Sequence, residues 1–168
     1  MRGSRIIVTA DPKGQFEEGF VNAGETFYPG ICVQRDATQA LQGGRFVYKL
    51  YAPGTDGEHP KGSYWIVTDH MAGIGGYAIT SATSFGSYIA GDRVQVYSPR
   101  PGEELNLLIA NLAGTADDHT KGEQLMVDTG TGKFIATTGT PESEPAQLLE
   151  TLTDPTADTL AWCQWGSV

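Results

Sequence analysis

The chain has 168 residues, 39% of them hydrophobic, which is enough for one domain with a packed core and an added arm or insertion. The formal net charge of −9 disfavours direct binding to nucleic acid, because an acidic surface repels phosphate. There is no long apolar run, so the sequence predicts neither a membrane span nor a secretory signal, and 22 glycines favour a turn-rich β protein.

The first stretch, residues 1–22, is predicted to be an N-terminal arm. Ile6, Ile7 and Val8 favour a short strand, which Pro12 ends, and the residues after it show no clear element. Fully extended, this arm would reach about 70 Å. An edge strand with a loop folded back onto the body is the alternative, and the sequence leaves both open.

Residues 23–168 are predicted to form a single β domain. Strands are expected at 25–34 (a pair kinked at Pro29-Gly30), 45–51, 63–68, 77–80, around Val94 and Val96, around Leu105 and Leu107, at 123–128 and 133–137 as a hairpin, and at 158–165. Within 63–68, Ile66 is expected on one face and Trp65 with Val67 on the other. Residues 147–150 allow one helical turn. The predicted fold is all-β: a compact β-barrel or β-tulip-like sandwich with an extended N-terminal arm and long loops.

One short motif recurs along the chain: a glycine followed by a carboxylate residue, at the start of a predicted strand. It stands at Gly91-Asp92, Gly102-Glu103 and Gly122-Glu123, and more loosely at Gly24-Glu25. Residues 98–102 separate the first two copies and contain two prolines, which cannot continue a strand ladder. We therefore expect a rigid rim loop there, between two strands of a barrel wall.

The residues that carry chemistry form no recognisable constellation. Three histidines lie far apart in polar segments, which argues against a zinc site, and no cofactor is predicted. The adjacent pairs Glu17-Glu18 and Glu103-Glu104 would point to opposite faces of a strand and so cannot share one site. These observations favour a structural or binding role over an enzyme.

The cysteines and tryptophans have mainly structural interpretations. Cys32 and Cys163 each lie in an alternating run and are expected to be buried, reduced thiols, although pairing stays open. Trp162 is expected in the core. The alternative is a sugar-binding platform of Trp65, Trp162 and Trp165, in which Trp65 and nearby tyrosines would contact the sugar.

From Gly91 onward the order of turns and strands resembles the head decoration (cement) proteins of tailed bacteriophages, a small β-barrel or β-tulip family. The resemblance spans roughly residues 24–165 and is carried by residues 90–96, 101–108, 122–128, 131–135, 148–152 and 157–163. It implies a virion protein on the outer capsid surface, assembled in the host cytoplasm, that bridges subunits of the major capsid protein and stabilises the head. It also implies a homo-oligomer, a trimer being favoured over a dimer, with no catalytic residue.

The predicted capsid or oligomer contacts follow from this resemblance. They are Arg2, Arg5, Ile6, Ile7, Val8, Lys13, Phe16 and Phe20 in the arm, and Arg100 in the rim loop. The cationic members give an acidic protein a local positive charge suited to an acidic shell. Two other classes stay open: a carbohydrate-binding β-sandwich module that uses Trp65, and a cupin-like enzyme, against which the absent histidine cluster argues.

Overall fold

A computed structural model describes residues 12–51, 64–68, 87–111, 118–128, 130–136, 146–153, 155 and 157–166. The regular elements in these residues are all strands, which confirms the all-β prediction. They are β1 (Gln15–Val21), β2 (Thr26–Phe27), β3 (Cys32–Arg35), β4 (Val47–Leu50), β5 (Trp65–Val67), β6 (Tyr88–Ile89), β7 (Arg93–Ser98), β8 (Glu104–Ile109), β9 (Gln124–Val127), β10 (Phe134–Ala136), β11 (Ala146–Leu148) and β12 (Thr159–Trp165). No helix in the described ranges is long and apolar enough to cross a membrane.

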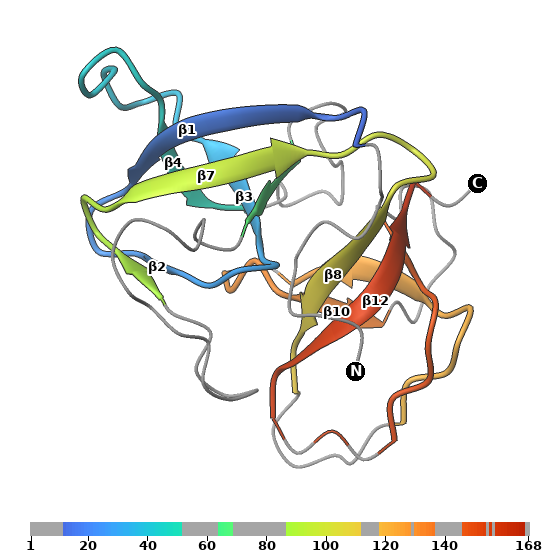
Figure 1. The fold of residues 1–168 in the computed structure, drawn as a ribbon. Coiled ribbons are helices and arrows are strands. Elements are labelled where there is room, and N and C mark those ends of the chain that lie inside the picture. Colours follow the sequence, from blue (N-terminus) through green and yellow to red (C-terminus); the bar gives the residue numbers. More distant parts are fainter. Residues whose placement is uncertain are drawn as a thin grey trace, which may run out of the picture.

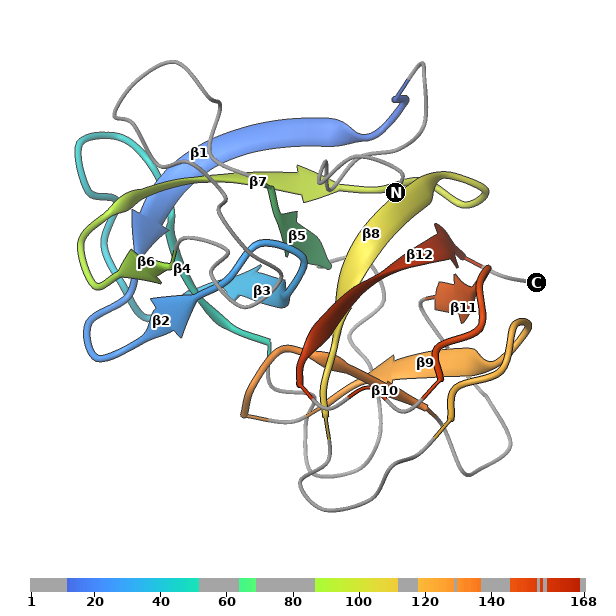
Figure 2. The same ribbon diagram turned by 60° about the horizontal axis from the view of Figure 1, so that its bottom comes forward.

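The strands close into two five-stranded barrels that lie side by side (Figures 1 and 2). Barrel 1 has the order β1-β4-β3-β5-β7, and barrel 2 has the order β10-β8-β12-β11-β9. A short ribbon of β2 and β6 lies beside barrel 1. The strands around Val94 and around Leu105 were predicted to share one barrel wall, but they belong to different barrels, and the segment between them joins the barrels.

The two barrels have the same topology. In each one, the first strand runs parallel to the third (β1 with β4, β8 with β10) and antiparallel to the last (β1 with β7, β8 with β12). The second strand pairs with the third and fourth, and the fourth pairs with the last. The sequence patterns did not predict that one barrel topology occurs twice in the chain. They did include the glycine–carboxylate turn, which occurs in both barrels.

Backbone hydrogen bonds fix how the two barrels correspond residue by residue. The Gly30 N–H donates to the Val67 carbonyl at 2.8 Å, and in barrel 2 the Gly122 N–H donates to Leu148 at 2.8 Å. Likewise the Asn22 N–H donates to Tyr48 at 2.9 Å, where Ala110 donates to Phe134 at 2.8 Å. With this match, Cys32–Arg35 corresponds to Gln124–Val127 and Trp65–Val67 to Ala146–Leu148.

The recurring glycine is the third residue of a four-residue turn. At Gly91 and Gly102 the φ angles are 84° and 89°, and the carboxylate residue that follows donates its N–H to the carbonyl three residues earlier. Positive φ at this position defines a type II turn and selects glycine. The same geometry recurs at Gly24, Gly30 and Gly122, which confirms that the motif marks a turn that opens a strand.

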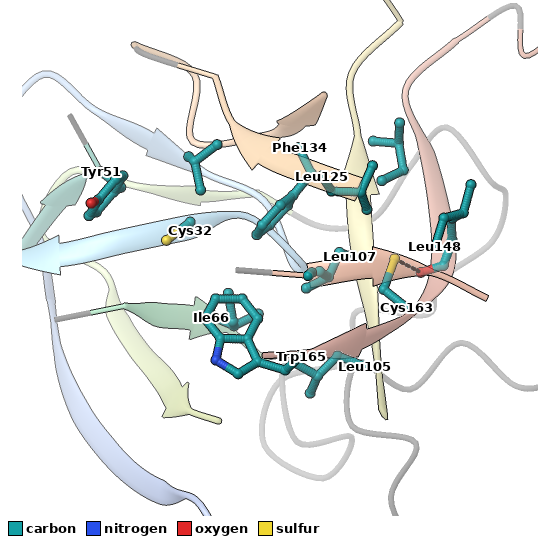
Figure 3. Close-up of a cluster of buried hydrophobic side chains, with 14 of the residues drawn as sticks. Cys32, Tyr51, Ile66, Leu105, Leu107, Leu125, Phe134, Leu148, Cys163 and Trp165 are labelled. Atoms are coloured by element: carbon teal, nitrogen blue, oxygen red, sulfur yellow. Dashed lines mark hydrogen bonds between the residues drawn. The ribbon is translucent and has the colours of Figure 1, made fainter. Parts of the chain in front are cut away.

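The barrels are joined through their backbones and through one core. The Leu108 N–H of β8 donates to the Gly30 carbonyl at 3.1 Å, and the Cys32 N–H donates to the Gly132 carbonyl at 2.7 Å. Figure 3 shows side chains of both barrels in one cluster, with Cys32 and Ile66 from barrel 1 among Leu105, Leu107, Leu125, Phe134, Leu148 and Trp165 from barrel 2. Trp65 and Val67 pack in the other cluster, inside barrel 1, which confirms the predicted faces of β5.

Three predictions about elements need correction. Residues 15–21 are not arm but β1, paired with β7 from Gln15 to Phe20, so the folded-back alternative describes them better; residues 1–11 lie outside the described ranges. The two strands expected within 25–34 do not pair with each other, because β2 pairs with β6 and β3 with β4 and β5. Residues 146–148 form β11 rather than a helical turn.

Candidate functional site

The buried carboxylate of Glu103 organises the junction between the barrels. It is 5% exposed and stands between β7 and β8. Its oxygens accept hydrogen bonds from the Tyr97 hydroxyl at 2.7 Å, the Arg100 N–H at 2.7 Å, the Gly14 N–H at 3.2 Å and the Lys13 N–H. One side chain thus ties the residues before β1, the strand β7 and the inter-barrel link together.

The environment of Glu103 favours its charged form. Burial alone would raise the pKa of the carboxyl group, but the four donors together outweigh this effect and hold the pKa below its ordinary value. Tyr97 shows the complementary effect, because burial and the bond to this carboxylate raise the pKa of its hydroxyl. The hydroxyl therefore stays protonated and remains a donor.

Three of the predicted contact residues meet around this carboxylate. Lys13 and Arg100 are bound to it through their backbone N–H groups, and both residues are exposed. The Phe16 ring packs on Tyr97 with 4.7 Å between ring centroids, and 46% of Phe16 remains exposed. We call Lys13, Phe16 and Arg100 the junction surface. It combines two cationic residues with an exposed aromatic ring.

The other predicted contact residues lie elsewhere. Phe20 is near the opposite end of β1, where its N–H donates to the carbonyl of Phe46 at 3.0 Å and its side chain is half-buried. Arg2, Arg5, Ile6, Ile7 and Val8 lie outside the described residues.

Sequence reasoning missed a polar cluster at the end of barrel 1. Arg35 forms a bidentate ion pair with Glu17, and the Tyr48 hydroxyl donates a hydrogen bond to the same carboxylate. We call Glu17, Arg35 and Tyr48 the polar triad. Burial first, and then the bond to Glu17, raise the pKa of Tyr48, so its hydroxyl remains a donor. The Arg35 guanidinium also lies 4.1 Å from the Phe46 ring centroid and 5.0 Å from that of Trp65.

The adjacent glutamates point to opposite faces, as predicted. Glu17 bonds within the polar triad, whereas Glu18 pairs with Arg45 at 3.2 Å and with Arg93 at 2.7 Å. Glu103 and Glu104 separate in the same way: Glu104 turns away from the junction and accepts the indole N–H of Trp162 at 3.0 Å.

Trp65 and Trp165, two of the tryptophans considered for a sugar-binding platform, are both buried. Trp65 is 6% exposed inside barrel 1 and Trp165 is 6% exposed in the shared core, so neither presents a ring face to solvent. Trp162, predicted to be core, is instead half-buried on the other face of β12 and donates to Glu104. The period of β12 explains this, since Ala161, Cys163 and Trp165 take the core face.

The cysteines are confirmed as buried thiols. Cys32 and Cys163 are both unpaired, and burial raises the pKa of each thiol far above its ordinary value. Figure 3 shows them apart in the shared cluster, with the Cys163 thiol directed at the Ala161 carbonyl at 3.3 Å. Such thiols act as small apolar side chains rather than nucleophiles.

Potential metal ligands are dispersed in the part of the chain that the structure describes, where no three His, Cys, Asp or Glu residues are grouped as they would be around a metal. His119 is 8% exposed and its Nδ1 lies 3.0 Å from a Glu123 carboxylate oxygen, next to the bridge between His119 and Leu152. This arrangement closes a loop of barrel 2. No protein-family model matches the chain, and no curated protein resembles it closely enough in sequence to count as a relative.

Proposed function

We propose that this chain is a structural virion protein that binds the outer surface of a bacteriophage capsid and stabilises the head by bridging major capsid protein subunits. The observation that carries the proposal is the ordered series of glycine–carboxylate turns and strands from Gly91 to Cys163, on which the resemblance to head decoration proteins rests. In the structure each of these turns opens a strand of a barrel wall.

The junction surface supports the same role. It presents Lys13, Phe16 and Arg100 on a rigid base, because the backbone on both sides is held by Glu103. An ordered cationic and aromatic surface has the composition of a protein-binding hot spot. Several such contacts on one shell gain avidity when copies are joined, and we propose a homo-oligomer, a trimer or a dimer, on that ground.

Electron microscopy of undecorated phage heads mixed with the protein tests this function. We expect added density on the outer surface with the wild type, and loss of that density with Lys13→Glu/Arg100→Glu. Both residues bind Glu103 through backbone N–H groups, so the fold should remain. Lys121→Glu, at an exposed residue of barrel 2, is compared with Lys13→Glu as the control, because Lys133 is held in an ion pair with Asp158. Heads that remain bare with the wild type would refute the proposal.

A second experiment addresses the arm. Because residues 15–21 form β1, and Lys13 and Gly14 before it bond to Glu103, the deletion that tests the arm is limited to residues 1–11. We expect this deletion to abolish binding to bare heads while the thermal unfolding midpoint stays within a few degrees of the wild type. Unchanged binding would show that the arm is dispensable and that the junction surface suffices.

A further inference from the structure

The polar triad occupies a layer that is apolar in barrel 2. Under the correspondence set by the backbone hydrogen bonds, Glu17 matches Leu105, Arg35 matches Val127 and Tyr48 matches Phe134. The three residues of barrel 2 are fully buried. Tyr48 and Phe134 differ only by the hydroxyl group that donates to Glu17. The same layer is therefore filled by apolar side chains in barrel 2 and by an ion pair with a tyrosine in barrel 1.

Folding does not require this polar layer, because barrel 2 has the same topology with an apolar one. Replacing a partly buried ion pair by apolar residues of similar volume is often neutral or stabilising, because the charges lose hydration. Barrel 2 shows that this topology accepts leucine, valine and phenylalanine in the layer. The ion pair instead fixes the Arg35 guanidinium beside Phe46, with 39% of its side chain still exposed. A guanidinium that is already held in one orientation loses little conformational entropy when it binds a partner.

Arg35 belongs to a larger surface on the same barrel. Arg35 pairs with Glu17 and lies over the Phe46 ring. Arg45, next to Phe46 in the chain, shares Glu18 with Arg93 on the other face of β1, so three of the chain's six arginines continue around this edge of the barrel. Phe46 is 39% exposed beneath Arg35. We call Arg35, Arg45, Phe46 and Arg93 the arginine surface. Arginine and aromatic side chains are the types that dominate binding energy in protein interfaces.

Charge is divided unequally between the barrels. Residues 1–103 contain nine of the eleven Lys and Arg residues and ten of the twenty Asp and Glu residues, a net charge of −1. Residues 104–168 contain two cations and ten acids, a net charge of −8. Among the described residues of barrel 2, six acids outnumber two cations; the acids are Glu104, Asp118, Glu123, Asp128, Glu150 and Asp158, and the cations are Lys121 and Lys133. Barrel 2 of another copy therefore carries the negative charge that the arginine surface would attract.

We propose that the arginine surface of barrel 1 docks onto the acidic barrel 2 of a second copy of this chain. The two partner surfaces are different, so two copies dock reciprocally across a two-fold axis, or successive copies dock head-to-tail into a ring or a chain. The inference specifies the oligomer contact within the proposed function, but its test needs no capsid. A chain that binds heads yet never self-associates would overturn this inference and leave the capsid proposal intact.

Sedimentation velocity across a range of protein concentrations tests the docking. We expect the wild type to associate at about 50 mM salt and to dissociate at about 500 mM, because exposed charges are screened. Arg93→Glu should weaken association by about tenfold or more. Lys121→Glu, an equal change of charge on barrel 2, should not weaken it. A wild type that stays monomeric, or an equal loss in both variants, would overturn the docking.

A second variant separates docking from folding. Glu17→Leu/Arg35→Val/Tyr48→Phe gives barrel 1 the three residues that barrel 2 has at the same places. We expect a thermal midpoint equal to or above that of the wild type, together with association weakened by about tenfold or more. Wild-type association in a folded triple variant would show that the polar triad takes no part in docking.

Discussion

Replacing Gly132 by alanine is expected to lower the free energy of unfolding by about 2–4 kcal/mol. Gly132 has a φ of 68°, and a Cβ atom there would stand 2.5 Å from the Cys32 carbonyl oxygen. That obstacle is backbone, so it cannot rotate away, and relieving it breaks the bond from the Cys32 N–H to the Gly132 carbonyl. Urea unfolding followed by tryptophan fluorescence measures the loss.

Gly130, in the same turn, is the matched control. Its φ is 96°, but a Cβ atom there would have nothing within 4 Å. Gly130→Ala therefore carries only the cost of a left-handed backbone, about 1 kcal/mol. The difference between the two variants isolates the close approach of the barrels. Equal losses in the two variants would mean that the barrels do not meet at Cys32.

Glu103→Gln is expected to lower the free energy of unfolding by about 2–4 kcal/mol at pH 7. Four donors converge on the wild-type carboxylate. An amide brings one acceptor oxygen and a donor group that faces other donors, so at least one buried N–H loses its partner. Thermal unfolding at neutral pH gives the size of the effect.

The pH dependence of stability gives a second signature of Glu103. Its pKa in the folded protein is lowered from the ordinary 4.5, so its contribution is full above that value and is lost as the pH falls through the folded pKa. Glu103→Gln should therefore flatten the acid limb of the stability profile. Glu104→Gln, which changes a carboxylate bonded to Trp162, should leave that limb in place.

Strands with regular alternation were predictable from the sequence. Regular alternation places the apolar residues on one face of a strand, and it can be recognised without knowing which strand pairs with it. Strands were predicted correctly on this basis at Val94 and Val96, at Leu105 and Leu107, and in the run through Cys163. The division into two barrels was not predictable, since closure depends on pairings such as Gln15 with Ser98 that are distant in sequence. Local patterns do not specify such partners.

β1 shows why one strand escaped prediction. Its sequence contains Gly19, which suggests a break, and two adjacent glutamates. A Cβ atom at Gly19 would stand 2.5 Å from the Tyr48 ring and from the Phe46 carbonyl oxygen, so the tyrosine fills the space that a side chain would take. Gly19 therefore allows the Tyr48 ring to pack closely against β1 and does not mark a turn.

The candidate surfaces were predictable in part. Lys13, Phe16 and Arg100 were selected by charge, aromatic character and loop position, but nothing local shows that one carboxylate gathers them. The polar triad had a detectable signal that single-strand patterns miss. When the two barrels are aligned, Glu17 corresponds to Leu105, so a charged residue occupies an apolar position. The alignment requires the pairing registers of β1 with β7 and of β8 with β12, which the sequence does not show.

The shared core has a consequence for synthesis on the ribosome. Barrel 1 has all five of its strands once Ser98 has emerged, but Cys32, Ile66 and Tyr97 belong to a cluster whose remaining members are made later. A half-made chain therefore presents an apolar flank until β12, the last strand, pairs with β8. Nascent chains with such flanks are prone to aggregate, and premature termination after barrel 1 should yield insoluble fragments.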